Sequence, residues 1–261
     1  MPGDHRDGTY RHTLAAQKRG ITMSAVTDFS CGKIYPQSIE QGLQKGDIYT
    51  VSGHKLYHHL CGFAFCFGES EDAVCKEIYS RFLSPDAVTD RRFVLFVSDR
   101  KAKDFFGAKE DLNISCRYFF EYQHKEPPEI RELPQGMRFC EIGRELFNKL
   151  PGRITPLFSW DNADDFVKNG KGICIMKGDE PAAWAFSAAV SDKELDIGIE
   201  TAESCRGQGL ATIVGAAMIR YALGCGKTPV WACHSENAGS VRTAEKLGFV
   251  RTAECVTVSR R

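Results

Sequence analysis

One segment near residue 200 constrains the fold of this chain more than any other, because it joins a strand pattern to a glycine-rich turn and a helix. Residues 195–201 (LDIGIET) alternate as in a β-strand, and residues 206–212 (RGQGLAT) place two glycines before an apolar helical pattern. Free N–H groups and the helix dipole attract anions to such a helix start, and glycine lets a ligand approach the backbone. The segment predicts an α/β fold with a phosphate-binding loop, although an ordinary glycine turn before a helix would show the same pattern.

Two common phosphate-binding motifs do not fit this loop. The dinucleotide-binding fingerprint requires a glycine where Thr212 stands, and a Walker loop requires a Gly-Lys-Ser/Thr sequence that is absent. The loop instead reads R-x-x-G-x-A over residues 206–211. A second pattern follows about thirty residues later, where a strand-like segment (PVWAC, 229–233) precedes Asn237 and the segment EKLGF (245–249).

Together the two patterns resemble the GNAT superfamily of N-acetyltransferases over residues 136–261. The first is similar to the superfamily's loop for the pyrophosphate of acyl-CoA, and the second to its N-x-x-S/A … K-x-G-F segment. The residues of the two patterns most resemble those of the branch that includes the zwittermicin A resistance acetyltransferases. The resemblance implies an α/β fold with a C-terminal mixed sheet flanked by helices.

The resemblance also implies acetyl-CoA as acyl donor, bound mainly through the backbone, and no metal. The main chain at the end of the strand would pair with the pantetheine arm, the loop amides would hold the pyrophosphate, and two polar residues of the second pattern would fix the arm or the thioester end. These cofactor-binding residues are Ile199, Glu200 and Thr201 in the strand, Arg206, Gly207, Gln208, Gly209, Leu210, Ala211 and Thr212 in the loop, and Asn237 and Ser240 in the second pattern. Asn237 also stands where it can cap the following helix.

The residue that would protonate the departing thiolate is missing. Many members of the superfamily carry a tyrosine seven residues after the asparagine, and this chain has Ala244 there. His234, Cys233, Tyr221 or water could replace the tyrosine, and we name His234 as the candidate side chain without ranking it above the others.

The general base is expected on the strand at 194–201. Strand alternation places Glu194, Asp196, Gly198 and Glu200 on one face, and an interior strand should carry such a row of carboxylates where that face meets a cleft. Glu200, or Asp196, could accept the proton of an ammonium substrate, directly or through water. A strand amide near Ile199 would stabilise the oxyanion. A solvated or salt-bridged strand end is the alternative interpretation.

The N-terminal half predicts a second, smaller α/β unit. Helix patterns at 36–46 and 71–82 alternate with strand patterns at 63–67, 92–97 and 114–122. We expect a disordered extension at 1–22, an N-terminal α/β domain over 23–125, a proline-rich linker at 126–135 and the acetyltransferase domain over 136–261.

Composition excludes several classes of protein. Thirty-four basic residues balance thirty-four acidic ones, so no net positive charge would attract nucleic acid or anionic membranes. The longest apolar stretch, residues 182–190, is too short to span a bilayer. Eleven cysteines without a C-x-x-C motif indicate reduced thiols in a cytoplasmic protein. His54 and His58 have a one-turn helical spacing, but without a glutamate partner we interpret them as structural.

The predicted function is acetyl transfer from acetyl-CoA to an amine by direct attack in a ternary complex. We expect a small-molecule amine as the partner, no nucleic acid or membrane, and a homodimer as a further expectation. The motifs leave an aminopolyol-like antibiotic, a polyamine, an amino acid and a protein amine open as acceptors. The missing tyrosine keeps a non-catalytic acyl-CoA-binding regulatory module as the alternative, and Thr212 weakens dinucleotide binding.

Overall fold

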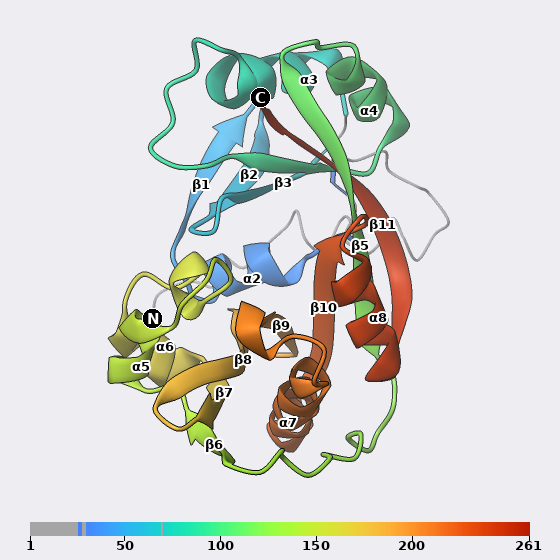
Figure 1. Cartoon of the computed structure of the whole chain (residues 1–261). Helices are drawn as coiled ribbons and strands as arrows, with labels where there is room; N and C mark the ends of the chain where they lie inside the picture. The colour runs from blue at the N-terminus through green and yellow to red at the C-terminus, as the bar shows by residue number, and fades with distance from the viewer. Residues whose placement is uncertain (1–25, 28–29, 69) are drawn as a thin grey trace, which may run out of the picture.

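The computed structural model of the protein describes residues 26–27, 30–68 and 70–261 (Figure 1). A single mixed sheet runs through this part of the chain in the order β1-β2-β3-β4-β11-β5-β10-β9-β8-β7-β6. The predicted α/β fold with a mixed sheet flanked by helices is confirmed. The predicted extension at 1–22 lies outside the described residues.

The strands and helices alternate along most of the chain. The strands are β1 (Gly46–Val51), β2 (His54–His59), β3 (Phe63–Phe67), β4 (Val94–Val97), β5 (Leu112–Tyr122), β6 (Met137–Glu141), β7 (Gly172–Lys177), β8 (Glu180–Val190), β9 (Glu194–Thr201), β10 (Thr228–His234) and β11 (Phe249–Arg260). The helices are α2 (Ile34–Glu40), α3 (Asp72–Ile78), α4 (Arg100–Gly107), α5 (Arg144–Lys149), α6 (Ala163–Asn169), α7 (Leu210–Gly224) and α8 (Ala238–Lys246).

The strands expected at 194–201 and 229–233 and the helix expected after the loop at 206–212 are present, and the errors lie in the N-terminal half. The sequence analysis did not predict β1, β2 or α4. His54 and His58 both lie on β2, so the helical spacing assumed for them is wrong. In the described part of the chain, no group of three or more His, Cys, Asp or Glu side chains lies close enough together to hold a metal ion. The helix expected up to residue 82 divides at Ile78, where a π-helical turn (Tyr79–Leu83) follows α3.

The sheet is continuous across the proline-rich segment at 126–135. β5 precedes that segment, yet it pairs with β10 and β11, which follow it. β4 joins the sheet through β11. The first half of the chain therefore supplies a central strand to the sheet of the second half, and the division into 23–125 and 136–261 stays a prediction about independent folding.

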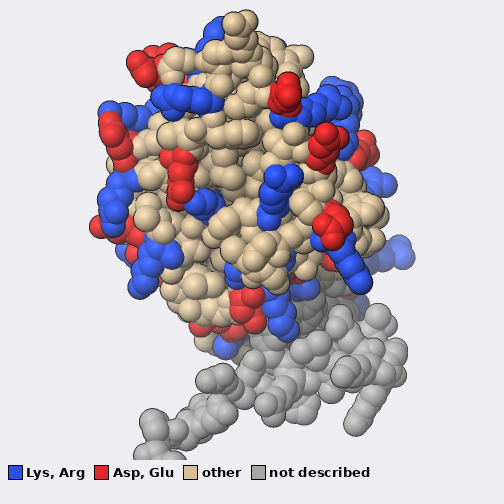
Figure 2. Space-filling model, turned by 90° about the horizontal axis from the view of Figure 1, so that it is seen from below, with Lys and Arg blue, Asp and Glu red and all other residues tan. Residues whose placement is uncertain are grey.

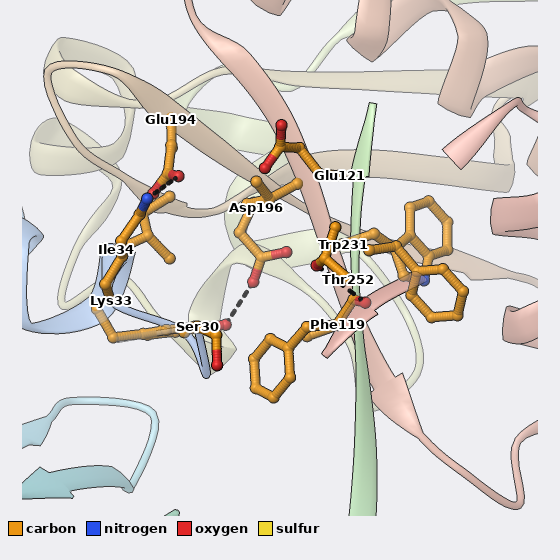
Figure 3. A pocket seen from close by; sticks show the side chains of 14 residues that line it. Ser30, Lys33, Ile34, Phe119, Glu121, Glu194, Asp196, Trp231 and Thr252 are labelled. Carbon is orange, nitrogen blue, oxygen red and sulfur yellow. Dashed lines mark hydrogen bonds and ion pairs between the residues drawn. The ribbon is translucent and has the colours of Figure 1, made fainter. Parts of the chain in front are cut away.

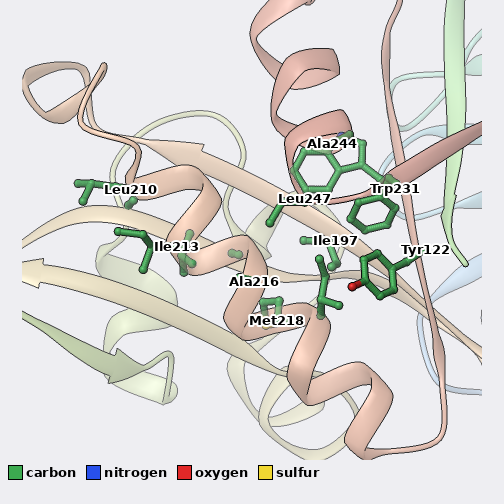
Figure 4. Close-up of a cluster of buried hydrophobic side chains, with 14 of the residues drawn as sticks. Tyr122, Ile197, Leu210, Ile213, Ala216, Met218, Trp231, Ala244 and Leu247 are labelled. Atoms are coloured by element: carbon green, nitrogen blue, oxygen red, sulfur yellow. The ribbon is translucent and has the colours of Figure 1, made fainter. Parts of the chain in front are cut away.

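Helices cover both faces of the sheet around β8. Ala183 and Ala185 point to the face covered by α7, where a core includes Leu210, Val214 and Met218 (Figure 4). The alternate positions of β8 point to the opposite face, and their side chains pack with those of α5 and α6; that second core includes Trp184, Phe186, Phe147 and Phe166. The buried side of α7 packs against the sheet along the length of the helix. The loop that precedes α7 is therefore held at the C-terminal end of β9.

Basic and acidic side chains are interspersed on the surface. Figure 2 shows one face on which Lys and Arg alternate with Asp and Glu, in keeping with the balanced composition. No helix in the described ranges is long and apolar enough to cross a membrane. All eleven cysteines are free thiols, and most are buried.

Candidate active site

The glycine-rich loop has the backbone conformation that its glycines predict. A short 3-10 turn (Glu203–Cys205) leads from β9 into the loop, and α7 begins at Leu210. Gly207 and Gly209 have φ of +79° and +77°, in the left-handed region that residues with a Cβ rarely adopt. Thr212 donates its hydroxyl to the Gly209 carbonyl at 2.6 Å. The start of α7 therefore has the geometry of an anion site.

β9 and β10 separate beside this loop. The two parallel strands pair at three positions, the last being Asp196 with Val230. Beyond that point β9 continues to pair with β8 as far as Thr201, and β10 continues to pair with β5 as far as His234. The described strands thus leave a wedge open between them, whose vertex lies at Asp196 and Val230.

A groove of about 1170 Å³ follows the open side of the wedge. It brings together the predicted residues of the strand, the loop and the second pattern, with Gln208 as the exception among them. Basic side chains that the motifs had not assigned also line it, namely Arg131, Arg153, Arg242 and Lys246. Together with Arg206 they outnumber the acidic lining residues, Glu129 and Glu200, so the groove suits a polyanion.

The second pattern forms the far wall of the groove. Asn237 is the N-cap of α8, and its Oδ1 accepts the Ser240 N–H at 3.0 Å. Its predicted capping role is confirmed. Trp231 donates its indole N–H to Ser240 Oγ at 3.0 Å, which ties the wall to β10.

Glu200 has a structural task in addition to any chemical one. Its Oε2 accepts the backbone N–H groups of Arg153 at 3.0 Å and Ile154 at 2.6 Å. A Cβ on Gly152 would lie within 2.8 Å of the Glu200 carboxylate, so a glycine is needed for this close approach. Glu200 therefore holds the loop between α5 and α6 against β9.

Asp196 lies at the vertex and is 4% exposed. Its Oδ2 accepts the hydroxyl of Tyr35 on α2 at 2.6 Å. Burial raises the pKa of Asp196 to about 6, although the Tyr35 hydrogen bond and Arg117 act in the opposite direction. Glu194, on the same face, pairs with Lys33 at 3.1 Å. The face of β9 that carries the carboxylates thus meets α2.

A cavity of about 180 Å³ lies beside this contact between α2 and the vertex (Figure 3). Its lining residues include Lys33, Tyr35, Phe119, Glu121, Glu194, Asp196 and Trp231. Sequence reasoning named Asp196 but missed Tyr35 and Lys33. No motif marks these two residues, because their position depends on how α2 packs on the sheet.

The candidates for a general acid do not line the groove or the vertex cavity. Ala244 carries no hydroxyl that could replace the missing tyrosine, and its side chain is fully buried. His234 lies at the end of β10, where its Nδ1 accepts the Glu236 N–H at 3.2 Å. Burial raises the pKa of Cys233, and burial raises that of Tyr221 to about 12. The catalytic role of His234 stays a prediction.

Known proteins share this architecture. The model of the GNAT acetyltransferase family matches residues 13–257. The chain is 26% identical over 199 residues to the uncharacterized N-acetyltransferase YdfB of Bacillus subtilis, covering 74% of this chain and 76% of that protein. A GCN5-related N-acetyltransferase-like protein from Streptococcus suis has a similar structure, with a TM-score of 0.68, 21% identity and coverage of 95% and 100%. A putative GNAT acetyltransferase from Novosphingobium aromaticivorans has a TM-score of 0.60 at 13% identity, with coverage of 90% and 100%.

Proposed function

This chain belongs to the GNAT acetyltransferase family, and we propose that it transfers the acetyl group of acetyl-CoA to the amine of a small molecule by direct attack in a ternary complex. That it is an N-acetyltransferase follows from the family. The donor site, the acceptor class and the residues that act are the content of the proposal. The observation that carries it is the groove that joins the loop before α7 to the wedge between β9 and β10.

The groove suits the donor in both charge and shape. The amides of residues 206–212 would hold the pyrophosphate at the start of α7, and the surrounding arginines would neutralise the phosphates. The pantetheine arm would lie along the free edge of β9 at Ile199, Glu200 and Thr201, where β10 no longer pairs. Asn237 and Ser240 would contact it from the opposite wall.

In this proposal the thioester end of acetyl-CoA points away from the loop. The loop follows the C-terminal end of β9, so an arm that starts at the loop and enters the wedge runs back toward the vertex. Asp196 lies five residues before Thr201 on β9, about 16 Å away at a strand rise of about 3.3 Å per residue. The thioester would therefore lie near the vertex.

The β9 carboxylates and His234 are the groups proposed for proton transfer. An ammonium acceptor must lose a proton before its nitrogen can attack the thioester carbon. Glu200 could accept it from the groove side, directly or through water; both of its described hydrogen bonds use Oε2, so Oε1 is the oxygen available for this. Asp196 could accept it from the side of α2. The proton for the thiolate would come from His234, which lies four residues beyond Val230 on β10, or from water, and a strand amide near Ile199 would stabilise the oxyanion.

Further features of the proposal rest on the sequence. The resemblance to the branch with zwittermicin A resistance acetyltransferases favours an amino-bearing natural product as acceptor. The free cysteines and balanced charge favour a cytoplasmic enzyme with no nucleic-acid or membrane partner. A homodimer is part of the same proposal.

The test is a CoA-release screen of the full chain against primary amines, combined with calorimetry of acetyl-CoA binding. We expect acetyl-CoA to bind and at least one class of amines to release CoA. Tight acetyl-CoA binding without turnover on any amine would favour the regulatory module that Ala244 suggests. Absence of acetyl-CoA binding would overturn the donor site.

A further inference from the structure

The vertex cavity, lined by Lys33, Tyr35, Phe119, Glu194, Asp196 and Trp231 among others, has a chemistry that matches one kind of ligand. We propose that it binds the ammonium group of the acceptor, that Asp196 accepts its proton, and that Tyr35 positions Asp196. This inference rests on the proposed acetyl transfer for its catalytic part, whereas the binding part can be tested alone.

The charge of the cavity favours a cation. Three carboxylates line it, those of Glu121, Glu194 and Asp196, against the single ammonium group of Lys33. Lys33 is already paired with Glu194 at 3.1 Å, so it does not neutralise Asp196. An ammonium guest would add a positive charge beside the buried Asp196 carboxylate, in addition to that of Arg117, whereas an anionic guest would add repulsion.

The aromatic lining of the cavity also favours an ammonium group. Tyr35 and Phe119 contribute aromatic side chains to the lining, and Figure 3 shows the ring of Phe119 near Asp196, whereas the indole of Trp231 packs in the core on the face of α7. Aromatic faces attract ammonium groups, and the attraction increases where water is excluded. A cavity of about 180 Å³ has room for the head of a small amine and not for a folded partner.

The cavity also lies where the reaction needs it. Asp196 and Val230 are the last paired residues before β9 and β10 separate, and both line the cavity. The groove for the donor opens on the other side of this point, and Trp231, which lines the cavity, donates to Ser240, which lines the groove. An amine held in the cavity would therefore face a thioester that arrives along the wedge.

The hydrogen bond from Tyr35 fixes the carboxylate that would take the proton. Tyr35 is 3% exposed, and burial followed by the charge of Asp196 raises its pKa well above the ordinary value, so it remains a donor. Burial raises the pKa of Asp196 to about 6, which makes it a stronger base than an ordinary aspartate while it is still ionised at neutral pH. The titratable and charged groups around it are Tyr35, Lys33, Arg117, Glu121, Glu194, Cys61 and Cys233.

The step balances without a further reagent. The ammonium gives one proton to Asp196, and the amine lone pair then forms the N–C bond with the thioester carbon. The C–S bond breaks with its electron pair moving to sulfur, and the second nitrogen proton ends on the thiolate. Asp196 returns its proton to solvent before the next cycle.

Calorimetric binding of butylamine, butanol and butyrate to the full chain tests the binding part. Butylamine should bind wild type at least about tenfold more tightly than butanol or butyrate. Asp196→Asn should remove most of this preference and leave butanol binding unchanged. Asp179→Asn, which changes an exposed carboxylate in the β7–β8 turn, should match wild type.

The pH dependence of butylamine binding to wild type supplies a readout that needs no variant of Asp196. Because butylamine stays protonated well above neutrality, its affinity for wild type should rise as Asp196 ionises, with a midpoint near pH 6. Tyr35→Phe removes a hydrogen bond that lowers the pKa of Asp196, so the midpoint should move to higher pH. A merely structural Tyr35 would not move it.

Equal binding of butylamine and butanol, an affinity independent of pH, or no butylamine binding at all would overturn the assignment. Failure of the donor site is a separate result, because calorimetry with acetyl-CoA alone reports it. Butylamine selectivity without acetyl-CoA binding would support the cavity and reject the proposed donor site. Acetyl-CoA binding with wild-type kinetics in Asp196→Asn would reject Asp196 as the proton acceptor.

Discussion

The buried carboxylate of Asp196 should make the stability of the protein depend on pH in a way that one substitution isolates. Burial raises its pKa in the folded chain from 3.8 to about 6. Between these values the folded state binds more protons than the unfolded state. The contribution of Asp196 to stability is therefore fully present below about pH 4 and is lost as the pH rises through about 6.

The size of the effect follows from the same shift. A difference of about two pKa units corresponds to about 3 kcal/mol of free energy of unfolding, since one unit is about 1.36 kcal/mol. Asp196 is 4% exposed, so solvent screens this effect little. In a protein whose whole stability is about 5 to 15 kcal/mol, such a loss is easily measured.

The assay is urea unfolding of wild type and Asp196→Asn at a series of pH values. Other carboxylates titrate in both proteins, so their contributions cancel in the difference. The amide can still accept the Tyr35 hydrogen bond, and any change in packing shifts the curve by a constant. We expect the stability difference to move in favour of the variant by about 3 kcal/mol between about pH 4 and about pH 7.

Two results would refute this reasoning. A difference that does not change with pH would mean that Asp196 has the same pKa in the folded and unfolded chains. A difference that moves in favour of wild type with rising pH would mean that the anion is stabilised, with Arg117 outweighing burial. The stability difference between wild type and Asp179→Asn, whose side chain is exposed, should not change with pH.

Three further predictions concern the donor site, the catalytic carboxylate and the N-terminus. Gly209→Val should weaken acetyl-CoA binding in calorimetry by about tenfold or more and cost about 1 to 3 kcal/mol of stability, whereas Gly178→Val, at another positive φ (+61°) outside the groove, should cost stability alone. Glu200→Gln should lower turnover most at low pH and approach wild type as the amine deprotonates; equal rates throughout a pH-rate profile would remove Glu200 from catalysis. A chain that starts at Met23 should keep its melting temperature and acetyl-CoA affinity, and a loss of several degrees would show that the preceding residues pack on the fold.

The sequence predicted elements whose signals are local. Residues 194–201 alternate and form β9 over the predicted range. Gly207 and Gly209 adopt the positive φ that explains why glycine stands there. Asn237 caps α8 as an asparagine before a helix is expected to do. In each case neighbouring residues contain the physical cause.

One missed hairpin also carried a local signal. β1 and β2 are joined by Ser52 and Gly53, both with positive φ, as in the two-residue turns that connect antiparallel strands. The sequence analysis instead took His54 and His58 as helically spaced. Ser52 is held by Glu77 of α3, which accepts both its N–H and its hydroxyl.

Long-range pairing explains the remaining gaps. β5 lies between β10 and β11 because strands from both halves of the chain share one sheet. No spacing within residues 112–122 indicates which strands will flank them. The basic residues of the groove were missed for the same reason, since Arg131 and Arg153 come from loops that only the fold brings near α7.

The choice among the β9 carboxylates shows where sequence reasoning ends. Alternation placed Glu194, Asp196 and Glu200 on one face and indicated that this face meets a cleft, but each carboxylate gains a different partner from a distant segment. Glu194 pairs with a cation and Glu200 accepts two backbone N–H groups, whereas the side-chain partner of Asp196 is the neutral hydroxyl of Tyr35, 161 residues away. A neutral donor compensates a buried charge less than a cation does, so burial dominates and raises the pKa of Asp196. The carboxylate best suited to take a proton near neutral pH is therefore set by the packing of α2 on the sheet, which nothing within residues 194–201 records.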